Sequence, residues 1–440
     1  MLKPFLRRIE PLKNSPFARN VSGMLAYTAL GHSIYMVSAP LIGRLFQPEQ
    51  VGLFGVFFTI AIFAAGFVCL LYDFAIPAAR THEEARELTV GAVALALLIC
   101  PLVGLGMALA SWLDRFGMGQ IPVWACLLMV PILFLQTGIQ IAQGWRIREN
   151  APMAIGRANV TLNASRGLLQ VGLGIFLPTW WVLAIGELLG RVASLERLVR
   201  RRVPKFRMLP SRKRVMATLA QYREFPLVLV PAQFIDGIAV VAQVSGITAL
   251  FGPAASGQYF LMRRTLDLPI AFIFRSLSDV FYAKLAAFTR DDPERIRPFF
   301  TRAFLLLALG GAAVGSPLIL FGPEIFHIVY GAGWEEAGAL AAVTLPAAIM
   351  NLAVAPVSRI FALTTKPNLR FVPALVGLIG TVGVLAASYR FSWDLWLTAA
   401  GFSATTSLGY LVYFAVGYVA SAHIRTAQNI GHQPIGSPES

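Results

Sequence analysis

Long apolar runs, separated by short polar segments, recur along the whole chain. Each run holds about 18 or more mostly apolar residues, which is enough for an α-helix to cross the hydrocarbon core of a bilayer. The pattern predicts an all-α polytopic membrane protein with twelve transmembrane helices. The predicted spans are 21–43, 51–72, 89–112, 121–143, 153–177, 179–197, 225–249, 256–283, 300–322, 337–363, 371–389 and 395–421.

The densest cluster of charge lies in the middle of the chain. The stretch from Glu196 to Glu224 carries ten Lys/Arg, and six predicted spans lie on each side of it. We therefore expect two six-helix lobes joined by a basic connector. The predicted organisation is an N-terminal segment (1–20), an N-lobe (21–197), the connector (198–224), a C-lobe (225–421) and a tail (422–440) that we expect to be disordered.

The distribution of Lys and Arg predicts the orientation. With the N-terminus inside, 26 of the 37 Lys/Arg fall in cytoplasmic segments and three in outer segments. Cytoplasmic loops of membrane proteins carry such an excess. We therefore predict a multi-pass protein of the bacterial inner membrane with both termini in the cytoplasm. The net charge of +15 is explained in this way, and we expect no nucleic-acid partner.

Composition excludes several other classes of protein. Only 13% of the 440 residues are charged, against about 25% in soluble domains. Cys69, Cys100 and Cys126 lie inside apolar runs, and the five histidines are scattered, so we expect no disulfide framework, metal site or cofactor. No predicted outer loop is long enough to hold a catalytic domain, so an enzyme is not expected.

One short motif occurs twice. Residues 45–54 and 250–259 share the pattern L-F-x-P-x-x-x-G-x-aromatic, and each copy joins the first and second spans of its half. Pro and Gly favour a tight turn between helices. Because each half has an even number of spans, we predict parallel repeats related by a pseudo-two-fold axis along the membrane normal.

Charged residues inside spans are the candidate functional residues, because such residues usually face the bundle interior or a water-filled cavity. Glu187 and Arg191 are four residues apart and can pair, as can Arg263 and Asp267. Arg157 and Arg166 have no acidic residue within four positions on their own helix. Arg166 is therefore expected either to face a lumen and bind an anionic substrate or to pair with another helix.

Several short motifs resemble one known family. They are Phe17-Ala18-Arg19-Asn20, Arg44 to Glu49, Tyr72-Asp73, Arg223-Glu224-Phe225-Pro226, Gly257-Gln258-Tyr259, Arg264 with Pro269, and Gly331 to Gly338 with Trp334. In this order they resemble the bacterial polysaccharide or O-antigen (lipid-linked oligosaccharide) flippases of the multidrug/oligosaccharidyl-lipid/polysaccharide exporter superfamily. Relatives often have Arg-Tyr-Glu where this chain has Leu71-Tyr72-Asp73, so the arginine of a possible ion pair is absent at this position.

The resemblance implies a flippase that moves an oligosaccharide on undecaprenyl pyrophosphate by alternating access through a cationic cavity between the lobes. The implied partners are the lipid-linked oligosaccharide, membrane lipid, a polysaccharide polymerase and glycosyltransferases. We expect the substrate to bind at Arg166, Arg264, Arg157, Arg191 and Arg263. Candidates for ion coupling are Glu187, Asp236 and Asp267. The alternative is a cation-coupled multidrug antiporter of the same superfamily, which would favour acidic over basic residues in the lobes.

Overall fold

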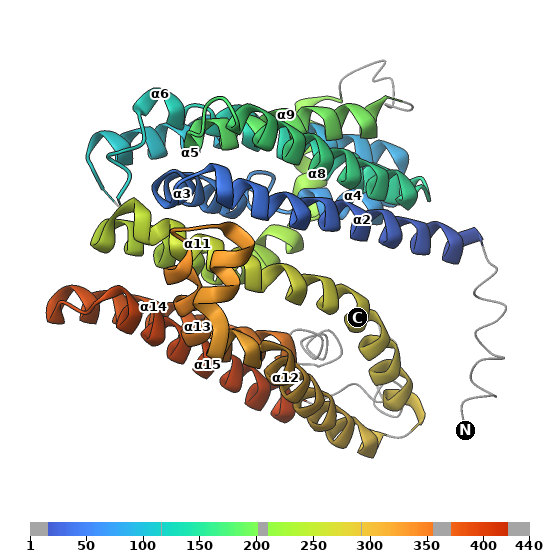
Figure 1. Cartoon of the computed structure of the whole chain (residues 1–440). Coiled ribbons are helices and arrows are strands. Elements are labelled where there is room, and N and C mark those ends of the chain that lie inside the picture. Colours follow the sequence, from blue (N-terminus) through green and yellow to red (C-terminus); the bar gives the residue numbers. More distant parts are fainter. Residues whose placement is uncertain (1–15, 116, 201–209, 292, 355–370, 421–440) are drawn as a thin grey trace. The chain divides into compact units, whose positions relative to one another are not determined.

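The computed structural model describes residues 16–115, 117–200, 210–291, 293–354 and 371–420, and all its regular elements in these ranges are helices (Figure 1). The predicted all-α polytopic class is therefore confirmed. The predicted tail, 422–440, and most of the predicted segment 1–20 lie outside the described residues.

The first half of the chain, up to the end of the predicted connector, forms nine helices in the described ranges. They are α2 (Pro16–Leu45), α3 (Pro48–Ala65), α4 (Tyr72–Ala78), α5 (His82–Trp112), α6 (Val123–Cys126), α7 (Met129–Arg148), α8 (Pro152–Gly174), α9 (Trp180–Val199) and α10 (Arg212–Gln221). The predicted span 51–72 is broken, because α3 ends at Ala65. Left-handed backbone at Leu70 and Leu71 then precedes α4.

The second half contains fewer but longer helices. They are η1 (Phe225–Leu229), α11 (Val230–Asp291), η2 (Pro293–Arg295), α12 (Ile296–Tyr330), α13 (Glu335–Val354), α14 (Phe371–Phe391) and α15 (Leu395–Ala420). The predicted spans 225–249 and 256–283 are joined within η1 and α11, with a kink at Gly252. Its φ of 85° lies in the left-handed region, which glycine adopts without the steric cost of a Cβ.

Nine helices within the described ranges are long and apolar enough to cross a membrane. The sequence predicted twelve spans, and the difference has two causes. The kinked α11 contains one continuous candidate from Gln233 to Asp267, and so the two predicted spans are counted once. Helices α8 and α9 are not among the nine, although the predicted spans 153–177 and 179–197 coincide with them. Polar residues interrupt the apolar run of α8, and charged residues interrupt that of α9.

The helices form two compact units. The first comprises Met1–Gly257 and Val329–Gly333, and the second comprises Gln258–Ile328 and Trp334–Ser440. In the first unit, α8 packs against both α2 and α9 (Figure 1). Helix α7 packs against α5 and α9. In the second unit, α15 packs against α13 and α14. The predicted lobe boundaries stay a prediction.

The two copies of the repeated motif contact each other reciprocally. A Cβ atom on Gly52 would lie 1.9 Å from the carbonyl oxygen of Pro253, and a Cβ atom on Gly257 would lie 1.9 Å from the carbonyl oxygen of Pro48. Equivalent residues thus exchange equivalent contacts, as at an interface with two-fold symmetry. The glycines let the two backbones touch, which gives the motif found in the sequence a structural role.

Candidate functional site

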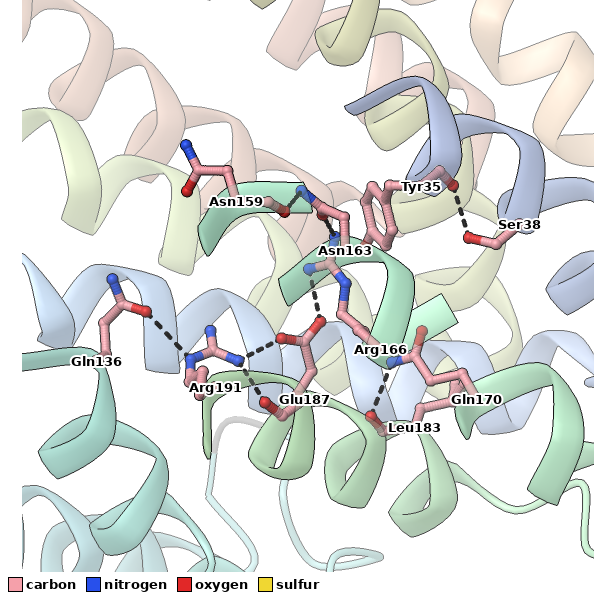
Figure 2. Close-up of polar contacts among 10 residues, drawn as sticks. All are labelled: Tyr35, Ser38, Gln136, Asn159, Asn163, Arg166, Gln170, Leu183, Glu187 and Arg191. Atoms are coloured by element: carbon pink, nitrogen blue, oxygen red, sulfur yellow. Dashed lines mark hydrogen bonds and ion pairs between the residues drawn. The ribbon is translucent and has the colours of Figure 1, made fainter. Parts of the chain in front are cut away.

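Three charged side chains meet inside the first unit, between α8 and α9. Arg166 Nη1 donates a hydrogen bond to Glu187 Oε1 at 2.9 Å. Arg191 Nη1 donates to the other carboxylate oxygen of Glu187 and, at 3.1 Å, to its backbone carbonyl oxygen. All three side chains are at most 8% exposed. One buried carboxylate therefore bridges two buried guanidinium groups (Figure 2).

Polar and aromatic groups from neighbouring helices complete this ionic cluster. Asn163 Oδ1 accepts a hydrogen bond from Arg166 Nη2 at 2.5 Å, and Gln136 Oε1 on α7 accepts one from Arg191 Nε at 3.2 Å. The Arg166 guanidinium carbon lies 3.4 Å from the centre of the Tyr35 ring on α2, a cation–π contact (Figure 2). Four helices of the first unit thus position the cluster.

Glycines on α9 allow the charges to meet. Gly186 and Gly190 are four residues apart, and helices with small residues at this spacing can approach closely in membranes. A Cβ atom on Gly190 would lie 3.1 Å from the Cβ of Arg166, and one on Gly186 would lie 2.5 Å from Cγ of Gln170. This close approach of α8 to α9 brings Arg166 within hydrogen-bonding distance of Glu187.

The cluster carries a surplus of positive charge, because two guanidinium groups face one carboxylate. It also has unused hydrogen-bonding capacity. Arg166 Nε and Gln170 Oε1 are buried and have no hydrogen-bond partner among the described residues. Buried polar groups are rarely left unsatisfied in folded proteins. The unsatisfied donor Nε of Arg166 and the net positive charge are the two properties of the cluster that would suit an anionic ligand.

The structure decides which partner Arg166 has. As the sequence indicated, no acidic residue lies within four positions on α8, but Glu187 on α9 pairs with it. Of the two expectations, the pair with another helix is the one observed. The predicted pair of Glu187 with Arg191 is confirmed. A position of Arg166 beside a water-filled path stays a prediction.

The other predicted site residues lie outside this cluster. Arg157 on α8 is exposed, with its guanidinium 5.6 Å from the centre of the Tyr27 ring. The predicted pair of Arg263 with Asp267 is confirmed at 3.2 Å in the second unit, and both side chains are partly exposed. The remaining two lie on α11, where Arg264 is partly buried and Asp236 is exposed.

Sequence reasoning missed the uncharged members of the cluster. Asn163 and Gln170 lie on α8 at spacings of three and four residues from Arg166, so all three share one helical face. This stripe of polar residues inside a predicted span is a readable signal. Tyr35 and Gln136 gave no comparable signal, because their roles depend on which helices pack together.

A second buried acid follows the break after α3. Asp73 is 7% exposed, and its Oδ1 accepts a hydrogen bond from the Cys69 thiol at 3.2 Å. Arg148 lies on the neighbouring helix α7, but it donates to the carbonyl oxygens of Ile76 and Ala79. Within the described ranges Asp73 has no ion pair, which agrees with the departure from Arg-Tyr-Glu.

Comparison with solved structures shows a shared fold. One similar structure is the inward-facing conformation of a multidrug resistance MATE family transporter of the MOP superfamily. It has a TM-score of 0.65 at 16% identity, over 89% of this chain and 94% of that one. Another is the lipid II flippase MurJ in an inward closed conformation, with a TM-score of 0.67 at 13% identity, over 89% of this chain and 86% of that one.

A third structure is the outward-facing conformation of a multidrug resistance MATE family transporter. It has a TM-score of 0.54 at 16% identity, over 94% of this chain and 97% of that one. None of the curated proteins matches the chain. Residues 41–339, however, match the family described as "Polysaccharide biosynthesis protein". This match covers more than half of the sequence, so the chain belongs to the polysaccharide biosynthesis protein family.

Proposed function

We propose that this protein is a flippase that moves an oligosaccharide on undecaprenyl pyrophosphate across the bacterial inner membrane by alternating access, for surface polysaccharide biosynthesis. Family membership and the fold shared with MOP-superfamily transporters support a membrane transporter. The observation that carries the substrate class is the surplus positive charge of the buried cluster, in which Arg166 and Arg191 share the single carboxylate of Glu187.

The chemistry of the carrier lipid explains why buried arginines suit it. The idealised cost of moving one ion into hydrocarbon is about 20 kcal/mol, and a pyrophosphate carries more than one charge. Arginine binds phosphate oxygens through two parallel hydrogen bonds and stays charged at any relevant pH. Arg166 and Arg191 are the first candidates to bind the pyrophosphate. Arg157, Arg263 and Arg264 are further candidates along the path.

Glu187 offers a way to couple substrate binding to a cation. Its carboxylate accepts hydrogen bonds from the guanidinium groups of both Arg166 and Arg191. Protonation of this carboxylate would weaken both ion pairs and release the arginines for an anionic ligand. Asp236 and Asp267 remain further candidates for ion coupling. The enzymes that make and polymerise the oligosaccharide, a class of glycosyltransferases and a polymerase, would supply and consume the substrate.

The test uses cells that depend on this protein for surface polysaccharide, with variants at matched protein level. R166M makes the cluster neutral and should lower export by about tenfold or more, because a hydrogen bond to a charged group contributes about 1.5–3 kcal/mol. R166M/E187Q restores a net charge of +1 through Arg191 and should export more than R166M. R166K should restore export only in part, because lysine lacks the planar guanidinium group that binds two phosphate oxygens at once.

The control is R115Q, which removes an exposed cation outside the cluster. The readouts are surface polysaccharide and accumulated lipid-linked oligosaccharide. Normal export by R166M would contradict the role of the surplus charge. If wild-type protein expels a cationic dye and its loss leaves the lipid-linked oligosaccharide unchanged, the multidrug antiporter is the correct function.

A further inference from the structure

The connector contains a helix with one docked face and one exposed face. In α10, Val215 and Thr218 are buried. Arg212, Lys213 and Arg214 in its first turn are exposed, and within the described ranges they make no ion pair. We call these three residues the basic turn.

Specific hydrogen bonds hold α10 against the start of α5. Thr218 Oγ1 donates to Glu87 Oε2 at 2.5 Å, and the Tyr222 hydroxyl donates to Glu84 Oε2 at 2.9 Å. Burial and the bond to Glu84 raise the pKa of Tyr222 above its ordinary value, so the phenol remains a donor. The Tyr72 hydroxyl also donates to the backbone carbonyl oxygen of Leu219 at 3.0 Å. The position of α10 on the first unit is therefore fixed.

These contacts place α10 at the boundary between polar and apolar surroundings. The first turns of α5 are polar from His82 to Glu87, and the apolar run begins at Leu88. Tyr72, Tyr222 and Trp145 also gather at this level, and aromatic side chains of this kind are enriched at membrane–water interfaces. The basic turn begins six residues before Thr218, about 9 Å along the helix, and therefore lies near the headgroup region.

The charge of the basic turn opposes the local preference of the helix. A helix N-terminus favours acidic side chains and is destabilised by cations, yet the first turn of α10 holds three basic residues and no acidic one. Residues that break a local rule often have a functional reason. Met216, the next exposed residue, is 58% exposed and adds an apolar side chain to the same face.

We propose that the exposed face of α10 binds the anionic phospholipid headgroups of the leaflet beside it. Arg212, Lys213 and Arg214 pair with the lipid phosphates, while Met216 enters the boundary between headgroups and acyl chains. Basic segments next to a transmembrane helix attract anionic lipids in this way. The combination of cations, an exposed methionine and a position at the hydrocarbon boundary favours a lipid surface over a nucleic acid or a soluble acidic protein.

The test places a fluorescent probe on this face of the full-length protein in nanodiscs. Ala217 is exposed and is replaced by cysteine for labelling, since Cys69, Cys100 and Cys126 are buried. The nanodiscs contain phosphatidylcholine alone or mixed with phosphatidylglycerol. In the mixed nanodiscs a nitroxide is placed on the headgroup of either lipid. Because α10 is held in place, the quenching reports which lipid gathers beside it. It should be stronger when phosphatidylglycerol carries the nitroxide, and high salt should weaken this difference because the basic turn is exposed.

The variant R212Q/K213Q/R214Q should lower the preference for phosphatidylglycerol by about fivefold for each charge removed. It should fold normally, because removing cations from a helix N-terminus is favourable. The matched control is R115Q/R390Q, which removes two exposed cations elsewhere and should leave the quenching unchanged. Equal quenching by the two nitroxide-labelled lipids, a probe that stays in water, or an unchanged preference in the triple variant would overturn the proposal.

Discussion

Replacing Gly52 by alanine should force the two copies of the repeated motif apart. The new Cβ would lie 1.9 Å from the carbonyl oxygen of Pro253. Ordinary contacts between carbon and a carbonyl oxygen are about 3.3 Å or longer, so the backbones must separate by about 1.4 Å. The clashing atom belongs to the backbone and cannot change rotamer to make room. We therefore expect the cost of an overpacked core, about 1–3 kcal/mol or more.

The reciprocal contact makes a second measurement informative. G257A places its Cβ 1.9 Å from the carbonyl oxygen of Pro48 and should cost about as much as G52A. The double variant should cost less than the two single changes together, because the separation caused by one Cβ makes room for the other. Residues in direct contact commonly show such non-additivity, of about 0.5–3 kcal/mol.

The chain supplies its own reporters for this assay. Cys69, Cys100 and Cys126 are buried free thiols and should react with a thiol-specific dye only on unfolding. Heating the detergent-solubilised protein with the dye gives a melting curve. The control is G172A in α8, where a Cβ would meet nothing within 4 Å and the alanine should help the helix. If G52A and G172A have the same melting temperature, the two copies of the motif do not make this close contact.

Two further variants test the ion pairs. E187Q should destabilise the protein by about 3–5 kcal/mol in the same assay, because it removes the counter-charge of two buried guanidinium groups. A melting temperature equal to that of R115Q would contradict this. D267N removes an ion pair between side chains that are 29% and 49% exposed, so it should lower the free energy of unfolding by less than about 1 kcal/mol. A larger decrease would contradict the exposure of this pair.

The fold class could be predicted from sequence because a transmembrane helix requires a long run of hydrophobic residues. A helix in lipid must satisfy its own backbone and present apolar side chains over its full length. The predicted pairs at i and i+4 were equally readable, because helix geometry fixes that spacing. The paired positions of Glu187 and Arg191, and of Arg263 and Asp267, needed no tertiary information.

The partner of Arg166 could not be read in the same way. It depends on which helix packs against α8 and on how closely, and Glu187 lies 21 residues further along the chain. The signals were present separately, as two glycines on α9 and a polar stripe on α8. Only the packing of α8 against α9 joins them. The helix α10 was also missed, because its sequence is too basic to resemble a span and too short for its periodicity to be clear.

Two helices that are not among the candidate spans hold three buried charged side chains. Helices α8 and α9 are missing from the nine candidate spans in the described ranges, yet they hold Arg166, Glu187 and Arg191 at 8% exposure or less. A charged residue in a membrane costs free energy that a neighbouring helix can offset by pairing with it. Gly186 and Gly190 permit this close pairing. The charged residues of these helices and the small residues between them therefore have one explanation: the first unit keeps its ionic cluster out of lipid by packing α8 against α9.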